Sequence, residues 1–231
     1  MPVLECRSLS KNYGSMQALS NVSFNVESGR IVGLLGPNGS GKTTFIKLVN
    51  GLLTPSSGTI LINGMEPCVD TRKLVSFLPD RTSIPTWMTA AQLLDFFCDF
   101  YSDFRRDAAV QMLSRLNISE KQRIKQMSKG TREKVQLILT MSRSASLYLL
   151  DEPIGGVDPA TRDYILSTII SNYNPEAAVI ISTHLIADVE RVLDDVIFIN
   201  EGRIVLQSSS DAIREEKGMS VDALFREVFK C

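Results

Sequence analysis

Short, mostly apolar runs recur along the chain and predict the buried strands of an α/β fold. Each run is too short for a helix, and most are rich in Val, Ile and Leu, as is typical of buried strands. The runs are residues 31–35, 75–78, 147–150 and 178–181. We expect further strands at residues 2–8, 18–27, 59–62, 194–200 and 203–207.

Helical periodicity is concentrated after residue 80 and at the end of the chain. Apolar positions recur at helical spacing over residues 89–101, 106–116 and 221–229. Additional helices are predicted over residues 45–49, about 128–144 and 160–172. We expect residues 81–145 to form a small helical insert on the parent sheet. The helical tail, about 209–231, is expected to pack on the domain, with docking of a partner helix as the alternative.

Composition and charge place the chain among single-domain globular proteins. Its 231 residues carry a formal net charge of −1, and 44 % of them are hydrophobic. The near-neutral balance argues against nucleic-acid binding through bulk charge. The sequence shows neither a secretion signal nor an apolar run of ~18 residues, so we expect a soluble protein. The cysteines lack metal-binding spacing, which favours reduced thiols in the cytosol; they are Cys6, Cys68, Cys98 and Cys231.

The strongest local motif is a glycine-rich stretch between a predicted strand and a predicted helix. It matches G-x-x-x-x-G-K-[ST] at every fixed position. The stretch is Gly36, Pro37, Asn38, Gly39, Ser40, Gly41, Lys42, Thr43 and Thr44. Glycines let the backbone point successive N–H groups inward, and the following helix adds the positive end of its dipole. Lys42 can reach the β- and γ-phosphates of a nucleotide, and the Thr43 hydroxyl can hold Mg²⁺. A glycine turn that binds nothing is the alternative, which the full match disfavours.

Two adjacent carboxylates end a predicted strand and form a second candidate feature. Asp151 can hold Mg²⁺ beside Thr43, directly or through water. Glu152 points elsewhere and could orient or deprotonate the attacking water. The alternative is a pair of solvated acids, and the upstream phosphate loop makes the catalytic interpretation the better one.

Three further positions are ambiguous from the residues alone. His184, the only histidine, ends a predicted buried strand; such a residue is usually structural, but a donor to the γ-phosphate would be needed there. Tyr13 could stack on a nucleotide base or lie on the surface of a turn. Ser128, followed by Gly130, stands at a predicted helix start, where it is either a simple N-cap or part of a second phosphate-binding site.

Taken in order, these motifs resemble the nucleotide-binding domain of ABC (ATP-binding cassette) ATPases over essentially the whole chain. Tyr13 matches the adenine-stacking aromatic residue, and residues 36–43 match the Walker A loop. The signature motif falls at residues 128–131, Ser-Lys-Gly-Thr. The remaining matches are the Walker B aspartate Asp151, the catalytic glutamate Glu152, the D-loop at residues 155–158 and the switch histidine His184.

The resemblance implies one domain, residues 1–231. It would have a P-loop core of mostly parallel sheet flanked by helices, an N-terminal antiparallel β-subdomain and the helical insert. It also implies that two such domains close head to tail over two ATP molecules, with Mg²⁺. Lys42, Glu152 and His184 would be catalytic. The residues that bind the nucleotide held mainly by the other copy would be Ser128, Lys129 and Gly130.

A location and partners follow from the same resemblance. The chain would be a cytoplasmic protein, peripheral on the inner face of the cell membrane, where it would drive separate transmembrane permease subunits. The second nucleotide-binding domain could be an identical or a different chain. No nucleic-acid partner is expected.

Two positions depart from the family pattern. The Q-loop glutamine is replaced by Asp80, which can still offer an oxygen to Mg²⁺ but is shorter and charged. Lys129 stands where the signature motif usually has glycine. Its charge opposes the helix dipole but could help to bind a nearby phosphate. Such lysine-bearing signatures resemble those of bacterial cassettes that export drugs, antimicrobial peptides or lipids.

The leading hypothesis is therefore the ATPase subunit of a membrane exporter. Because the tail after the cassette is short, we expect no added regulatory domain like that of some importer ATPases. The main rival is a soluble ABC protein that acts on ribosomes or DNA, which a single cassette with a short insert disfavours. A subunit with little hydrolysis is a third hypothesis, which Asp80 keeps open and which Glu152 and His184 oppose. A P-loop GTPase is disfavoured because the sequence contains no N-K-x-D motif.

Overall fold

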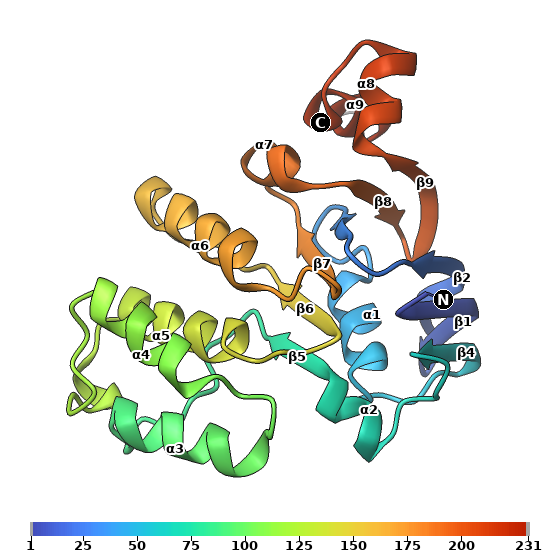
Figure 1. Cartoon of the computed structure of the whole chain (residues 1–231). Coiled ribbons are helices and arrows are strands. Elements are labelled where there is room, and N and C mark those ends of the chain that lie inside the picture. Colours follow the sequence, from blue (N-terminus) through green and yellow to red (C-terminus); the bar gives the residue numbers. More distant parts are fainter. Residues whose placement is uncertain (1, 230–231) are drawn as a thin grey trace.

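The computed structural model describes residues 2–229, whose strands form two sheets (Figure 1). The smaller sheet is antiparallel, has the order β2-β1-β4, and comprises β1 (Leu4–Tyr13), β2 (Met16–Val26) and β4 (Ser57–Ile62). The larger sheet has the order β5-β6-β7-β3-β8-β9. Its strands are β3 (Ile31–Leu35), β5 (Val75–Leu78), β6 (Leu147–Asp151), β7 (Ala178–Thr183), β8 (Asp195–Asn200) and β9 (Arg203–Ser209). All of its pairs are parallel except β8 with β9, so the predicted α/β class and its antiparallel N-terminal part are confirmed.

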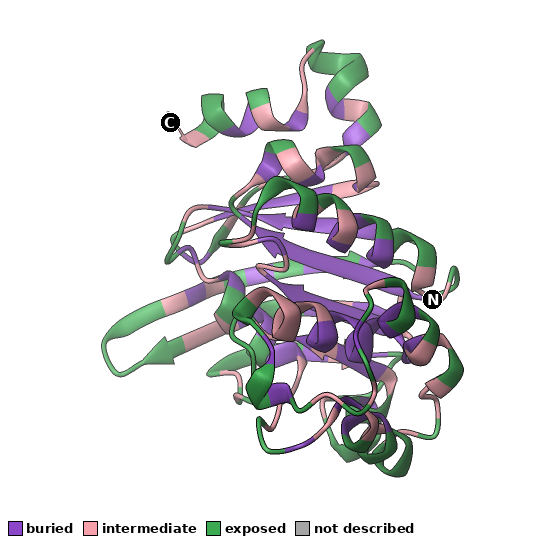
Figure 2. Cartoon of the chain, turned by 90° about the vertical axis from the view of Figure 1, so that its left-hand side faces the viewer, coloured by how far each residue is buried: buried purple, intermediate pink, exposed green. Residues whose placement is uncertain are grey.

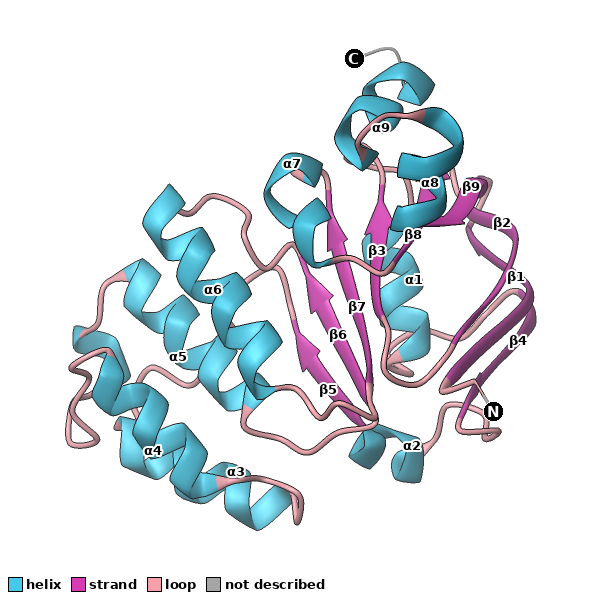
Figure 3. Cartoon of the chain, turned by 45° about the horizontal axis from the view of Figure 1, so that its top comes forward, coloured by secondary structure: helices cyan, strands magenta, loops and turns pink. Residues whose placement is uncertain are grey.

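Helices lie on both faces of the larger sheet (Figure 3). The first four helices are α1 (Lys42–Val49), α2 (Val69–Leu74), α3 (Ala90–Phe100) and α4 (Arg106–Arg115). The others are α5 (Lys129–Met141), α6 (Pro159–Asn172), α7 (Ile186–Val189), α8 (Ser210–Lys217) and α9 (Val221–Phe229). Short 3-10 turns occupy Ile124–Gln126 and Glu190–Val192.

The core lies on the two faces of the larger sheet because successive strand residues point to opposite sides. Within β7, Val179 and Ile181 face a cluster shared with α5, α6, α7 and α9. Ala178 and Ile180 face the other side, where α1 and the antiparallel sheet complete a second cluster. Figure 2 shows the resulting layer of buried strands between helices that are exposed only on their outer surfaces. Burial on both faces explains why these strands are continuous apolar runs.

The helices between residues 90 and 141 have a core of their own. Figure 1 shows α3 and α4 set away from the larger sheet, with α5 between them and α6. Helix α5 serves both cores: Leu137 and Met141 join the sheet cluster, while Val135, Ile138 and Leu139 join the helical one. A shift of this helical part would therefore move residues that pack directly on the larger sheet.

Arg143 also ties the helical part to β5. Its buried guanidinium lies 3.0 and 3.1 Å from the two oxygens of Asp103, in the loop between α3 and α4. It also donates to the carbonyl oxygens of Lys73 and Val75 and stacks 3.8 Å from the ring centre of Tyr101. Val75 is the first residue of β5, so this contact ties the helices to the start of the strand that leads to Asp80.

Several predicted boundaries were wrong for identifiable reasons. Strand β1 continues to Tyr13, well past the predicted end at residue 8, because its polar residues pair with β2 in a long hairpin. Helix α5 ends at Met141 rather than Ser144, because the chain leaves the helix where Arg143 makes its contacts with Asp103 and Val75. Helices α2, α7 and α8 lack an apolar stripe long enough to predict them. The predicted tail extends to residue 231, and its last two residues lie outside the described part of the chain.

Candidate functional site

The register of three neighbouring strands brings the predicted site residues to one edge of the larger sheet. Leu35 of β3 pairs with Thr183 of β7, and Asp151 of β6 pairs with Ser182, which is also in β7. All three strands are parallel, so the loops that follow them leave the sheet at the same edge. Ligands of open α/β sheets bind at this carboxyl edge.

The glycine-rich loop after β3 has the backbone geometry of an anion nest. Gly39 and Gly41 have φ values of 80° and 110°, which favour glycine. A β-carbon on Gly41 would also lie 2.7 Å from the carbonyl oxygen of Ala18, so no other residue fits there. Helix α1 begins at Lys42, and within residues 2–229 no side chain caps its N-terminus. Its first N–H groups are therefore left for a ligand that accepts hydrogen bonds.

Lys42 is held inside this loop. Its side chain is only 6 % exposed, and its ammonium donates to the carbonyl oxygens of Gly36 and Pro37 over 2.7 and 3.1 Å. The same ammonium lies 3.5 Å from Oε1 of Glu152. Burial lowers the pKa of Lys42, while the Glu152 carboxylate opposes that shift. A phosphate could replace Glu152 as the counter-charge of this ammonium.

Thr43 and Asp151 meet at the start of α1. The Thr43 hydroxyl donates to Oδ1 of Asp151 over 3.2 Å, and the Ser182 hydroxyl donates to the same oxygen over 2.6 Å. Burial raises the pKa of Asp151, the hydrogen bonds from Ser182 and Thr43 oppose that shift, and the negative charges of Asp80 and Glu152 add to it. A buried carboxylate beside a hydroxyl suits a divalent cation.

That cation would need oxygen atoms from elsewhere. Within the described residues, no group of three His, Cys, Asp or Glu side chains is placed to hold a metal ion alone. The donor set of Thr43, Asp151 and Asp80 fits Mg²⁺ bound together with phosphate, because Mg²⁺ is commonly held by one or two carboxylates plus substrate oxygens.

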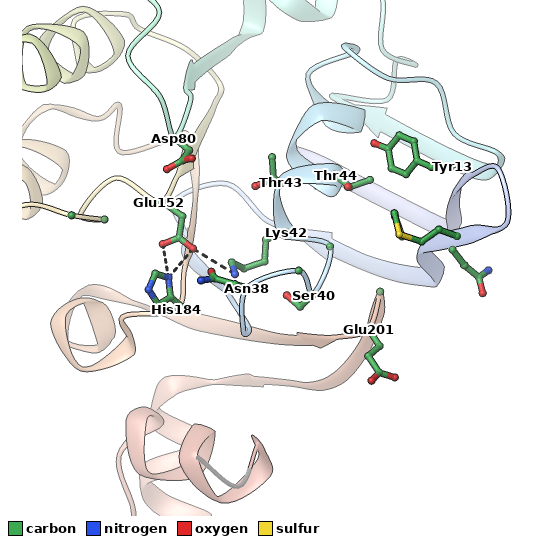
Figure 4. Close-up of a pocket in the computed structure, with 18 residues that line it drawn as sticks. Tyr13, Asn38, Ser40, Lys42, Thr43, Thr44, Asp80, Glu152, His184 and Glu201 are labelled. Atoms are coloured by element: carbon green, nitrogen blue, oxygen red, sulfur yellow. Dashed lines mark hydrogen bonds and ion pairs between the residues drawn. The ribbon is translucent and has the colours of Figure 1, made fainter.

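Glu152 projects into the space in front of Lys42 (Figure 4). Its φ is 47°, in the left-handed region that L residues avoid, and its N–H donates to the Ser182 carbonyl oxygen over 3.0 Å. Its Oε2 accepts a 3.1 Å hydrogen bond from the Thr183 hydroxyl. Nδ1 of His184 lies 3.1 Å from both carboxylate oxygens. The predicted catalytic residues Lys42, Glu152 and His184 are thus in direct contact.

These groups line a cavity of about 820 Å³, which is large enough for a nucleotide. Tyr13 lies on the far side of the cavity from Glu152 and is 42 % exposed (Figure 4). Its ring is free to offer one face to a base, with Lys11 Nζ 5.4 Å from the ring centre. Five lining residues were not predicted from the sequence, because only the folded hairpins bring them there: Met16, Gln17, Ala18, Glu201 and Gly202.

The structure does not bring the signature motif into this cavity. Ser128 is the exposed N-cap of α5, where its hydroxyl oxygen accepts from the N–H of Thr131 over 3.1 Å. Lys129 lies 3.7 Å from Glu133 and lines a separate cavity of about 520 Å³, and Gly130 follows in the first helical turn. The predicted site residues Gly36, Pro37 and Asp151 do not line the cavity themselves but contact Lys42 or Thr43, which do, whereas Ser128, Lys129 and Gly130 lie apart from it. Asp80 lines both cavities.

The profile of the ABC transporter family matches residues 19–155 of the chain. The chain belongs to this family. It is therefore an ATP-binding and ATP-hydrolysing subunit that powers a membrane transporter. No helix among residues 2–229 is long and apolar enough to cross a bilayer.

Similar proteins agree with this assignment. The ABC transporter ATP-binding protein YtrB of Bacillus subtilis is 31 % identical, with 93 % of this chain and 74 % of YtrB aligned. The SkfA peptide export ATP-binding protein SkfE of the same organism is 32 % identical, with 89 % and 88 % aligned. A solved structure of an ATP-binding subunit of an ABC transporter superimposes with a TM-score of 0.88 at 28 % identity, covering 98 % of this chain and 99 % of that one.

Proposed function

We propose that two copies of this cassette close over two ATP molecules, and that each site combines the cavity of one copy with residues 128–130 of the other. The observation that carries this proposal is the separation within one chain of the phosphate loop from Ser128. Ser128 stands at an exposed helix N-terminus, which is suited to bind an anion supplied from outside its own chain. A different but related cassette as the second copy fits the same arrangement.

The residues around the phosphate loop would bind and orient the nucleotide. Lys42 exchanges its contact with Glu152 for the β- and γ-phosphates, and the N–H groups of the loop and of α1 surround them. Thr43, Asp151 and Asp80 would hold Mg²⁺. The cation neutralises charge on the phosphates when it is bound. Tyr13 supports the adenine ring from across the cavity.

Glu152 would act on the attacking water. Its carboxylate faces the phosphate loop and can accept a hydrogen bond from water, which orients that water toward the γ-phosphate. His184 contacts the same carboxylate and would contact the γ-phosphate once the pair has closed. The positive charges of Lys42 and of the opposing Lys129 stabilise the charge that develops during transfer.

Closure of the pair would be converted into movement of separate permease subunits. Helix α5 packs on the larger sheet, and Arg143 holds the start of β5, the strand that leads to Asp80, so a change at the nucleotide can move a partner bound to the helical part. We place the complex on the cytoplasmic face of the cell membrane. Export is the direction we favour, since SkfE is named for peptide export and the Ser-Lys-Gly-Thr signature favours the same group.

The substitution Glu152→Gln should separate closure from hydrolysis. The amide keeps the shape of the side chain but cannot act as a base, so turnover should fall at least ~100-fold while ATP binding persists. Size-exclusion chromatography with light scattering should then show a dimer in ATP and Mg²⁺. The control Lys42→Ala/Glu152→Gln should stay monomeric because the phosphates lose their main cation. Wild-type turnover in Glu152→Gln would contradict the assigned role.

Asp80→Gln tests whether Asp80 strengthens cation binding. Removing one negative charge beside Asp151 should weaken the apparent affinity for Mg²⁺ about fivefold, which corresponds to about 1 kcal/mol of charge interaction. The measurement is ATPase activity as a function of Mg²⁺ at saturating ATP. Asp70→Asn, which removes an exposed carboxylate paired with Lys73, serves as the control. Equal Mg²⁺ dependence in all three proteins would remove Asp80 from the cation site.

The permease partner can be sought directly. We expect the tagged chain, expressed with its neighbouring genes and purified from detergent-solubilised membranes, to retain a polytopic membrane protein in stoichiometric amount. Mass spectrometry would identify it. Recovery of ribosomal or nucleic-acid-binding proteins without such a partner would instead support the soluble rival.

A further inference from the structure

The two oxygens of the Glu152 carboxylate have different surroundings. Oε1 lies 3.5 Å from the ammonium of Lys42 and so faces the phosphate loop. Oε2 accepts a 3.1 Å hydrogen bond from the hydroxyl of Thr183, the last residue of β7. One oxygen therefore faces the ligand side of the cavity, while the other is attached to the sheet.

The hydroxyl of Thr183 is fixed in direction as well as in place. Thr183 is fully buried, and its strand lies between β6 and β3 in the larger sheet. The N–H of Leu185 donates to Oγ1 of Thr183 over 3.0 Å, which leaves the single hydroxyl proton for an acceptor. An ionised carboxylate only accepts, so Thr183 must donate to Glu152.

The other two contacts of the carboxylate are less permanent. Lys42 leaves Glu152 when it takes up the phosphates, as proposed above. The His184 side chain is 39 % exposed and lies beyond the end of β7, where a turn of its backbone can move it. Thr183 is the one of the three contacts that is buried within a strand and engages no ligand.

We propose that Thr183 is a positioning residue for ATP hydrolysis, one that anchors Oε2 of Glu152 so that Oε1 faces the attacking water. This inference rests on the proposed role of Glu152. Anchoring one oxygen removes the rotation of the carboxylate before the reaction begins, which lowers the entropy cost of orienting water. It also restricts the rotation of a side chain whose residue, Glu152, lies just beyond the end of β6 and has a left-handed backbone conformation.

The test compares Thr183→Val and Thr183→Ser in steady-state ATPase assays of the full chain. Valine has nearly the same shape but no hydroxyl, so kcat should fall about 10- to 100-fold, as expected for loss of a hydrogen bond to a charged group. KM for ATP should change less than about twofold, because the phosphates and the base are bound elsewhere. Serine restores the hydroxyl and should restore kcat.

Two further variants separate positioning from a structural effect. Thr168→Val removes another buried hydroxyl, which donates over 2.8 Å to the Tyr164 carbonyl oxygen in α6, and should leave kcat unchanged. Thr183→Ala also removes the hydroxyl and replaces the valine variant if that one fails to fold. Thermal unfolding measurements would show whether each variant is folded. Wild-type kcat in the folded Val or Ala variant would overturn the proposal, as would a rise in KM alone.

A double-mutant cycle decides whether Thr183 acts through Glu152. In the Glu152→Gln background, Thr183→Val should cause little further loss of single-turnover hydrolysis, because the base is already absent. An equal fold-loss in both backgrounds would overturn the proposal and leave Glu152 as the base. Full turnover in Glu152→Gln alone would instead overturn the proposed role of Glu152, and with it this inference.

Discussion

The parallel register of β3, β6 and β7 is the constraint on which the site depends. The three strands end at the same level of the sheet, where Leu35 and Asp151 pair with neighbouring residues of β7. Residues distant in sequence therefore meet within hydrogen-bonding distance. Burial of the apolar faces of these strands stabilises this arrangement. Because both faces are buried, the polar residues lie at the ends of the strands. A shift of one strand by a single residue would separate Glu152 from Thr183.

Without a ligand, the ammonium of Lys42 has a counter-charge in Glu152, while the neighbouring carboxylates leave an excess of negative charge. Lys42 is surrounded by loop carbonyl oxygens and Glu152, and Asp151 has a raised pKa beside two other carboxylates. Phosphate can replace the contacts of the ammonium, and a divalent cation can relieve the carboxylates. The helix start at Ser128 lies apart from these groups, as the proposed pairing of two copies requires.

Local motifs were predictable from the sequence, and so was the meeting of Asp151 with Thr43, but contacts outside the motifs were not. The phosphate loop depends on residues adjacent in the chain, so its spacing alone indicated the strand, the turn and the helix around it. The contact of Thr183 with Glu152 depends on strand order, which no local pattern specifies. Polar residues in β1 similarly concealed a strand that extends to Tyr13, because the end of the β1–β2 hairpin reaches beyond β4 and, being largely exposed, needs no apolar alternation.

A mixing experiment tests most directly whether the catalytic site is shared between two chains. Lys42→Ala and Ser128→Arg should each be inactive alone, since one lacks the phosphate cation and the other blocks the opposing helix start. Random pairing of equal amounts makes half of the dimers mixed, each with one intact site, so about a quarter of wild-type turnover should return. Turnover no greater than the sum of the two separate variants would contradict a site composed of two chains.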